Sequence, residues 1–73
     1  MSLPKEFPRI TLKQGMLGGK PCIRGMRFPV CEVLRLLASG MTSQEILADH
    51  PDLEAEDITE SLWYAAQLAE EKR

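Results

Sequence analysis

The feature that most constrains the fold of this chain is a pair of helix-start patterns that lie close together in the second half of the sequence. In the first, Thr42 and Glu45 have the S/T-x-x-E spacing of a capping box, and Met41 and Ile46 occupy the two positions of a hydrophobic staple. This helix is expected to end near His50, because a proline follows and disfavours helical geometry at the residue before it. Only a short helix fits between the two patterns.

The second start pattern repeats the staple but changes the cap. Leu53 and Ile58 again stand at the staple positions, while the capping position holds Glu54, a much weaker N-cap than Ser, Thr, Asp or Asn. The carboxylates of Glu56 and Asp57 compensate in part, because negative charge is favourable at a helix N-terminus. The apolar spacing that follows predicts a last helix of about 17 residues.

An earlier helix precedes these two. It is expected to begin at Pro29 or Val30 and to end at Gly40, because apolar residues recur at i, i+3, i+4 and i+7 between them. Three helices joined by short turns match the helix-turn-helix plan, in which the second helix braces the third. Plain three-helix packing has the same apolar spacing, so the pattern does not separate a DNA-binding unit from a structural one.

The N-terminal part predicts a β element. Residues 1–8 show no period and contain two prolines, so we expect a flexible arm followed by one domain over residues 9–73. Residues 9–13 alternate in polarity, which is typical of a half-buried strand with Ile10 and Leu12 facing the core.

A stiff, cationic segment, GGKPCIRGMRFPV, links this strand to the helices. Its prolines restrict the backbone and Gly25 permits a positive φ, so we expect a tight hairpin. Ile23 and Phe28 are expected to face the core, with Arg24 and Arg27 beside the turn. The predicted fold is mainly α: a short N-terminal β hairpin followed by a three-helix, homeodomain-like helix-turn-helix bundle.

The chain is short for a self-sufficient core. Chains below about 80 residues usually rely on disulfides, a metal or a second subunit. Cys22, Cys31 and His50 lack the spacing of a zinc site and the signature of a cysteine nucleophile, and no apolar run is long enough to span a membrane. We therefore expect a cytoplasmic protein with reduced thiols, which forms a homodimer. We also expect no metal, no cofactor, no small-molecule substrate and no enzymatic activity.

Charge is distributed unevenly along the chain. Residues 1–40 carry seven basic and two acidic residues, whereas residues 41–73 carry two basic and nine acidic ones. This asymmetry suggests that the first half meets an anion and the second half avoids anions or meets a cation. The alternative is that the charges only solvate exposed faces.

The cationic segment is the candidate nucleic-acid interface. The third helix is poorly suited to that role, because its first residues are acidic and phosphates repel them. Basic side chains near the hairpin are better placed to contact a DNA backbone or groove, and the candidates are Arg24, Arg27, Lys20, Arg9 and Lys13. In the alternative, the arginines pair with the acidic half of the chain, within one subunit or across a dimer.

The last helix is the candidate protein interface. Its length exceeds what so small a core can cover, and we expect Trp63, Tyr64, Leu68 and Leu62 to bind another chain. With the acidic half, these side chains would cover a basic groove of a partner protein. The alternative for the same residues is a homodimer seam.

The chain contains, in this order, the motifs GKP, I-x-G-x-R, PV, GMT, PDL and EDI. With these motifs it closely resembles domain-of-unknown-function family 433 over about Ile10 to Ala66. Two positions depart from the family pattern. Met26 stands where the family commonly has threonine, and Glu54 stands where it commonly has threonine or serine. Its members are regarded as antitoxin-like helix-turn-helix proteins. The resemblance implies a small bacterial protein with a β element and a trihelical domain, often dimeric. Genes of the family frequently stand beside that of a predicted PIN-like nuclease.

These observations favour a non-enzymatic antitoxin of a toxin-antitoxin system, which binds a PIN-like nuclease toxin and autoregulates by binding its own promoter. The alternative is a protein-protein interaction module with no nucleic-acid role. The two differ in salt dependence, because contacts to phosphates weaken steeply as salt concentration rises.

Overall fold

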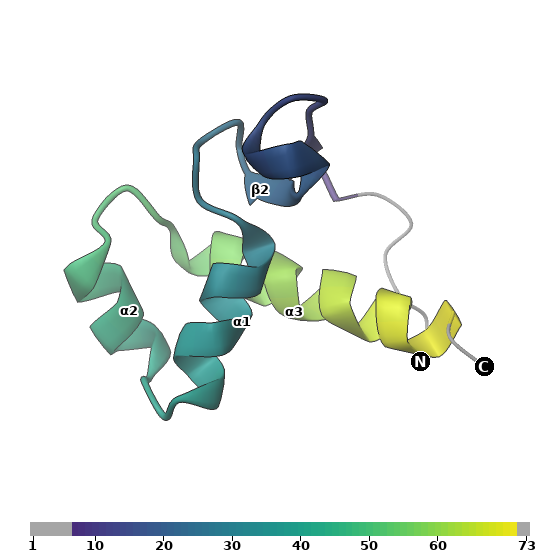
Figure 1. Ribbon diagram of the computed structural model, residues 1–73. Coiled ribbons are helices and arrows are strands. Elements are labelled where there is room, and N and C mark those ends of the chain that lie inside the picture. Colours follow the sequence, from purple (N-terminus) through teal and green to yellow (C-terminus); the bar gives the residue numbers. More distant parts are fainter. Residues whose placement is uncertain (1–6, 72–73) are drawn as a thin grey trace.

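A computed structural model describes residues 7–71 of the chain (Figure 1). The elements run in the order β1 (Ile10–Leu12), a 3-10 turn η1 (Leu17–Gly19), β2 (Pro21–Ile23), α1 (Val30–Ala38), α2 (Ser43–Asp49) and α3 (Ala55–Glu71). The fold is mainly helical, with a two-stranded antiparallel ribbon above a three-helix bundle, as the sequence predicts. Most of the expected arm, residues 1–8, lies outside the described residues.

The helix boundaries follow the capping patterns of the sequence. In the capping box of α2, the backbone N–H of Glu45 donates to Thr42 Oγ1 at 3.1 Å, and the backbone N–H of Thr42 donates to Glu45 Oε1 at 2.8 Å. Gly40, just past the end of α1, has a φ of 104°, a left-handed geometry that favours glycine. The expected ends of α1 and α2 and the expected 17-residue length of α3 are confirmed.

The cationic segment forms the expected tight hairpin. Arg24 and Gly25 have φ values of 44° and 73°, and the N–H of Met26 donates to the carbonyl of Ile23 at 2.7 Å. Two successive residues in the left-handed region are the mark of a type I′ turn, whose twist suits a β hairpin. The sequence indicated the positive φ at Gly25 but not the one at Arg24.

The core lies where the ribbon meets the three helices. Its buried apolar members are Ile23, Val30, Val33, Ile46, Leu53 and Ile58. Ile10 and Phe28 pack against this core as expected, but the prediction for Leu12 is wrong, because 67% of this residue is exposed. β1 is only three residues long, and Leu12 pairs with Pro21 at its last position.

Helix α3 is longer than the core that it covers. Figure 1 shows α3 passing α1 and continuing beyond it toward the C-terminus. Asp57, Ile58 and Ser61 in its first half are buried, whereas Leu68 and the residues after it to Glu71 are exposed. Within residues 7–71, no helix has the length and apolar content needed to cross a membrane.

Candidate functional site

A buried carboxylate at the start of α3 links the ribbon to the helices. Asp57 has no exposed surface, yet both of its oxygens are fully engaged. Oδ1 accepts hydrogen bonds from Arg9 Nη1 at 3.0 Å and Arg24 Nε at 3.1 Å, and Oδ2 accepts from Arg24 Nη2 at 2.8 Å. Oδ2 also accepts from the backbone N–H of Glu54 at 2.8 Å, so the same side chain caps α3.

The two arginines make further bonds that fix them in place. Arg9 Nη1 donates to Glu54 Oε1 at 2.6 Å, and the backbone N–H of Arg9 donates to Glu60 Oε1 at 2.6 Å. Arg24 Nη2 donates to the carbonyl of Asp52 at 2.7 Å. Both guanidinium groups therefore lie between the ribbon and the turn that precedes α3, and we call these three residues, Arg9, Arg24 and Asp57, the ion triad.

The pKa of Asp57 is set by two opposing effects, its burial and the hydrogen bonds that it accepts. Burial raises this pKa, but hydrogen bonds from Arg24, from the Glu54 N–H and from Arg9 outweigh burial, so the net pKa lies below the ordinary value. The pKa of Arg9 is raised, chiefly by its hydrogen bonds to Glu54 and Asp57, and that of Arg24 is raised chiefly by Asp57. All three groups are charged over the physiological pH range.

The five basic residues predicted to bind nucleic acid fall into two groups, those in the ion triad and those outside it. Arg9 and Arg24 are held by Asp57, the intramolecular pairing that we had kept as the alternative. Lys13, Lys20 and Arg27 are exposed and make no ion pair with any residue between 7 and 71. A contact with DNA by the free protein would therefore fall mainly to these three side chains.

Asp57 is the functional residue that sequence reasoning missed. It was assigned only to the favourable charge at the start of α3. Its position three residues after the capping residue Glu54 was the available clue, because a carboxylate there bonds back to the capping N–H.

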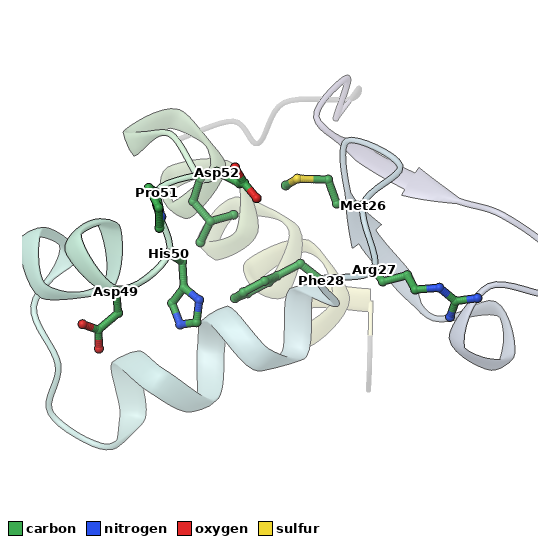
Figure 2. Close-up of a pocket in the computed structure, with 8 residues that line it drawn as sticks. Met26, Arg27, Phe28, Asp49, His50, Pro51 and Asp52 are labelled. Atoms are coloured by element: carbon green, nitrogen blue, oxygen red, sulfur yellow. The ribbon is translucent and has the colours of Figure 1, made fainter.

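A surface pocket of about 360 Å³ lies beside the triad, between the hairpin and the turn from α2 to α3 (Figure 2). We call it the turn pocket; its lining residues are Met26, Arg27, Phe28, Asp49, His50, Pro51, Asp52 and Leu53. The rings of Phe28 and His50 meet edge to face with centroids 4.9 Å apart. Figure 2 shows these two rings pointing toward each other, while the guanidinium of Arg27 points away from them.

The surface around the turn pocket is acidic and open. Asp49, Asp52 and Glu56 are exposed and make no ion pair within the described part of the chain. Beneath them, the apolar side chains of Met26 and Phe28 are half buried. The pocket thus offers an apolar floor with two carboxylates, Asp49 and Asp52, and the guanidinium of Arg27 at its edge. The carboxylates outnumber the cation, which favours a partner surface that is both basic and apolar.

The four residues expected to bind a partner occupy different positions on α3. Tyr64 is half buried and meets the ring of Phe7 edge to face at 5.3 Å, and Leu68 lies further along the same side of the helix. Leu62 is 49% exposed on another side, and Trp63 is half buried. Sequence analysis grouped these residues together, but the structure does not place them on one surface.

Among residues 7–71, no three Cys, His, Asp or Glu side chains are grouped so that they could bind a metal ion. Cys22 is buried and Cys31 half buried, and both are free thiols. Cys22 Sγ donates to the carbonyl of Lys20 at 3.3 Å, so the structure gives it a packing role.

A β ribbon tied to three helices by the ion triad defines the class: a small helix-turn-helix domain with an N-terminal ribbon. The chain belongs to the family described as protein of unknown function DUF433, whose model matches residues 10–65. It is 38% identical over 56 residues to the uncharacterised protein y4eO of Sinorhizobium fredii, covering 77% of this chain. The chain spans only 25% of that relative's length.

The fold also agrees with a solved structure. A crystal structure of a DUF433 member protein from Anabaena variabilis is similar with a TM-score of 0.79 and 34% sequence identity, over 85% of this chain and 61% of that one. The ribbon and helices described above are therefore a fold that another member of the family also has.

Proposed function

We propose that this protein is a non-enzymatic, antitoxin-like binding protein that uses the acidic surface around the turn pocket to cover a basic surface of a partner protein. The partner class suggested by the family resemblance is a PIN-like nuclease. The proposal goes beyond the family assignment, which specifies no activity.

One observation supports this proposal more than any other. A helix-turn-helix protein reads DNA with the first residues of the second helix of the motif, here the start of α3. In this chain the two arginines nearest to that point are held by Asp57, and the carboxylates of Asp52 and Glu56 remain exposed beside them. Such a surface repels phosphates and attracts a cationic protein.

Autoregulatory DNA binding is the second candidate function. The exposed Lys13, Lys20 and Arg27 support it, because cationic side chains without intramolecular partners are free to contact phosphates. An interaction module without any nucleic-acid role remains the alternative to this second activity and is compatible with the acidic surface.

The test uses the purified chain and any PIN-like nuclease whose gene stands beside its own. We expect a complex in which nuclease activity is inhibited, and we expect Asp49→Lys to weaken binding by about tenfold because it reverses one charge at the pocket edge. Glu32→Lys is the control, since it also reverses one carboxylate, but on α1 outside the pocket, where Glu32 is half buried and pairs with Arg35.

Circular dichroism would confirm that both variants fold. Equal weakening by the two substitutions would show that only net charge matters and would refute the turn pocket as the site. The absence of any complex with the wild-type chain would refute the proposed partner.

A further inference from the structure

The turn pocket has two aromatic walls that stand almost at right angles to each other. The planes of the Phe28 and His50 rings are inclined at 78°, and their centroids lie 4.9 Å apart. Met26 and Leu53 line the pocket beside these rings. A side chain with an apolar stem and a flat, charged end fits such a corner, because the stem covers apolar surface while the flat end lies against a ring.

Two carboxylates line the same pocket, and they differ in direction. Asp49 and Asp52 are exposed and make no ion pair within residues 7–71. Figure 2 shows the carboxylate of Asp52 directed toward the hairpin, where Met26 lies, whereas that of Asp49 is directed away from the two rings. Asp52 is therefore the carboxylate better placed to pair with a group inside the pocket, and Asp49 adds negative charge at the edge.

The end of α2 adds partial negative charge on this side of the molecule. Residues 50–53, the turn that follows α2, all line the pocket. The carbonyl of Leu47 has no donor four residues later, because Pro51 has no N–H. Unpaired carbonyls at the C-terminal end of a helix favour a cation nearby.

The arginines of the hairpin do not supply that cation. Arg27 stands at the edge of the pocket, and its guanidinium points away from the two rings (Figure 2). Arg24 is held by Asp57 and by the carbonyl of Asp52. Neither arginine makes an ion pair with the carboxylate of Asp52, so this carboxylate is open to a cation from another molecule.

We propose that the turn pocket holds the side chain of one arginine from the surface of the partner protein, with its guanidinium against the aromatic walls and paired with Asp52. This inference rests on the proposed function and deepens it, since it names the group of the partner that the acidic surface recognises. Arginine is favoured over lysine because its guanidinium is planar, stacks on aromatic rings and donates two parallel hydrogen bonds to a carboxylate.

The experiment is an NMR titration of the purified chain with a blocked tripeptide, acetyl-Ala-Arg-Ala-amide, at constant ionic strength. Two control peptides replace the arginine with lysine and with citrulline, which has the shape of arginine without its charge. His50 is the only histidine in the chain, so its ring resonances report on the pocket directly. We expect the arginine peptide to bind with a dissociation constant on the order of 1 mM. It should bind at least about threefold more tightly than the lysine peptide and about tenfold more tightly than the citrulline peptide.

A pair of carboxylate variants tests the role of Asp52. Asp52→Asn removes the charge and keeps a residue that suits the same turn, so it should weaken binding of the arginine peptide by about fivefold or more. Glu56→Gln is the matched control, because Glu56 is also exposed and makes no ion pair in the described part of the chain, but does not line the pocket. It should leave the dissociation constant within about twofold of the wild-type value.

A third variant tests the aromatic wall. Phe28→Leu keeps an apolar side chain but removes one ring, so the preference for arginine over lysine should be lost. Circular dichroism would verify that the variants fold, and the comparison of Asp52→Asn with Glu56→Gln does not depend on the folding of Phe28→Leu.

Three results would overturn the proposal. The first is an arginine peptide that binds no more tightly than the lysine or the citrulline peptide. The second is a loss of affinity in Glu56→Gln as large as that in Asp52→Asn. The third is a titration in which the ring resonances of His50 do not move.

These measurements need no nuclease, so the two proposals fail separately. A pocket that does not bind the arginine peptide refutes this inference even where a complex with a nuclease forms. The absence of a complex refutes the proposed partner even where the peptide binds.

Discussion

At the scale of single residues, Asp57 is the side chain that joins Arg9 and Arg24 of the ribbon region to the start of α3. Replacing it with asparagine keeps the shape but removes the charge that holds Arg9 and Arg24. We expect Asp57→Asn to lower the free energy of unfolding by roughly 2 kcal/mol, because hydrogen bonds to charged groups contribute about 1.5–3 kcal/mol. The loss stays at the lower end since the arginines keep about a third of their surface in water.

Urea denaturation would measure this change, with the exposed Asp49→Asn as the control. A loss for Asp57→Asn no larger than that of the control would contradict a structural role for the triad.

The same residue predicts how stability depends on pH. The pKa of Asp57 in the folded chain lies below its ordinary value of 3.8. Its contribution is therefore fully present above that value and is lost as pH falls through the folded-state pKa. Thermal unfolding between about pH 2 and 7 should show wild-type stability falling more steeply below about pH 4 than that of Asp57→Asn. Parallel curves for the two proteins would rule out this contribution.

At the scale of elements, α2 and α3 begin with different caps. Thr42 caps α2 through a hydroxyl, so Thr42→Ala should lower the free energy of unfolding by about 1 kcal/mol. The neighbouring Ser43→Ala, at the first helical position, is the control and should have a much smaller effect. Thermal unfolding of both variants is the measurement, and equal effects would argue against the cap.

Helix α3 has no such hydroxyl and instead relies on Asp57, which bonds to the N–H of Glu54 while pairing with the ribbon. One carboxylate thus both caps α3 and holds the ribbon. The start of α3 and the position of the ribbon are coupled for this reason, so a change at either affects the other.

At the scale of the whole molecule, folding pairs some basic residues of the first half with acidic residues of the second half and leaves the other charged residues exposed. Pairing within the triad leaves Lys13, Lys20 and Arg27 as the exposed cations of the ribbon region. If the chain binds its own upstream duplex, each alanine substitution at these positions should reduce the slope of log affinity against log salt by about 0.9, because one released counterion is lost.

Gel-shift titrations at several salt concentrations would measure this slope. A slope that all three substitutions leave unchanged would exclude these residues as phosphate contacts.

The sequence by itself determined the features that depend on neighbouring residues. The ends of α1, the capping box at Thr42 and the turn at Gly25 were all predicted correctly, because each rests on bonds or backbone angles within about four residues. The apolar spacing likewise predicted three helices and the length of α3. Family motifs such as PDL and EDI fall at these same boundaries, which is why the resemblance and the local patterns agree.

Only the tertiary structure decided what the charges and the outermost apolar residues do. Arg9 and Arg24 are separated from Asp57 by 48 and 33 residues, and nothing local to any of them specifies the pairing. The alternation at residues 9–13 predicted a buried Leu12, but burial requires another element that covers the side chain, and Leu12 is 67% exposed. The placement of Leu68 on the same side of α3 as Tyr64, and of Leu62 on another side, was decided in the same way, by which side of α3 the rest of the chain covers.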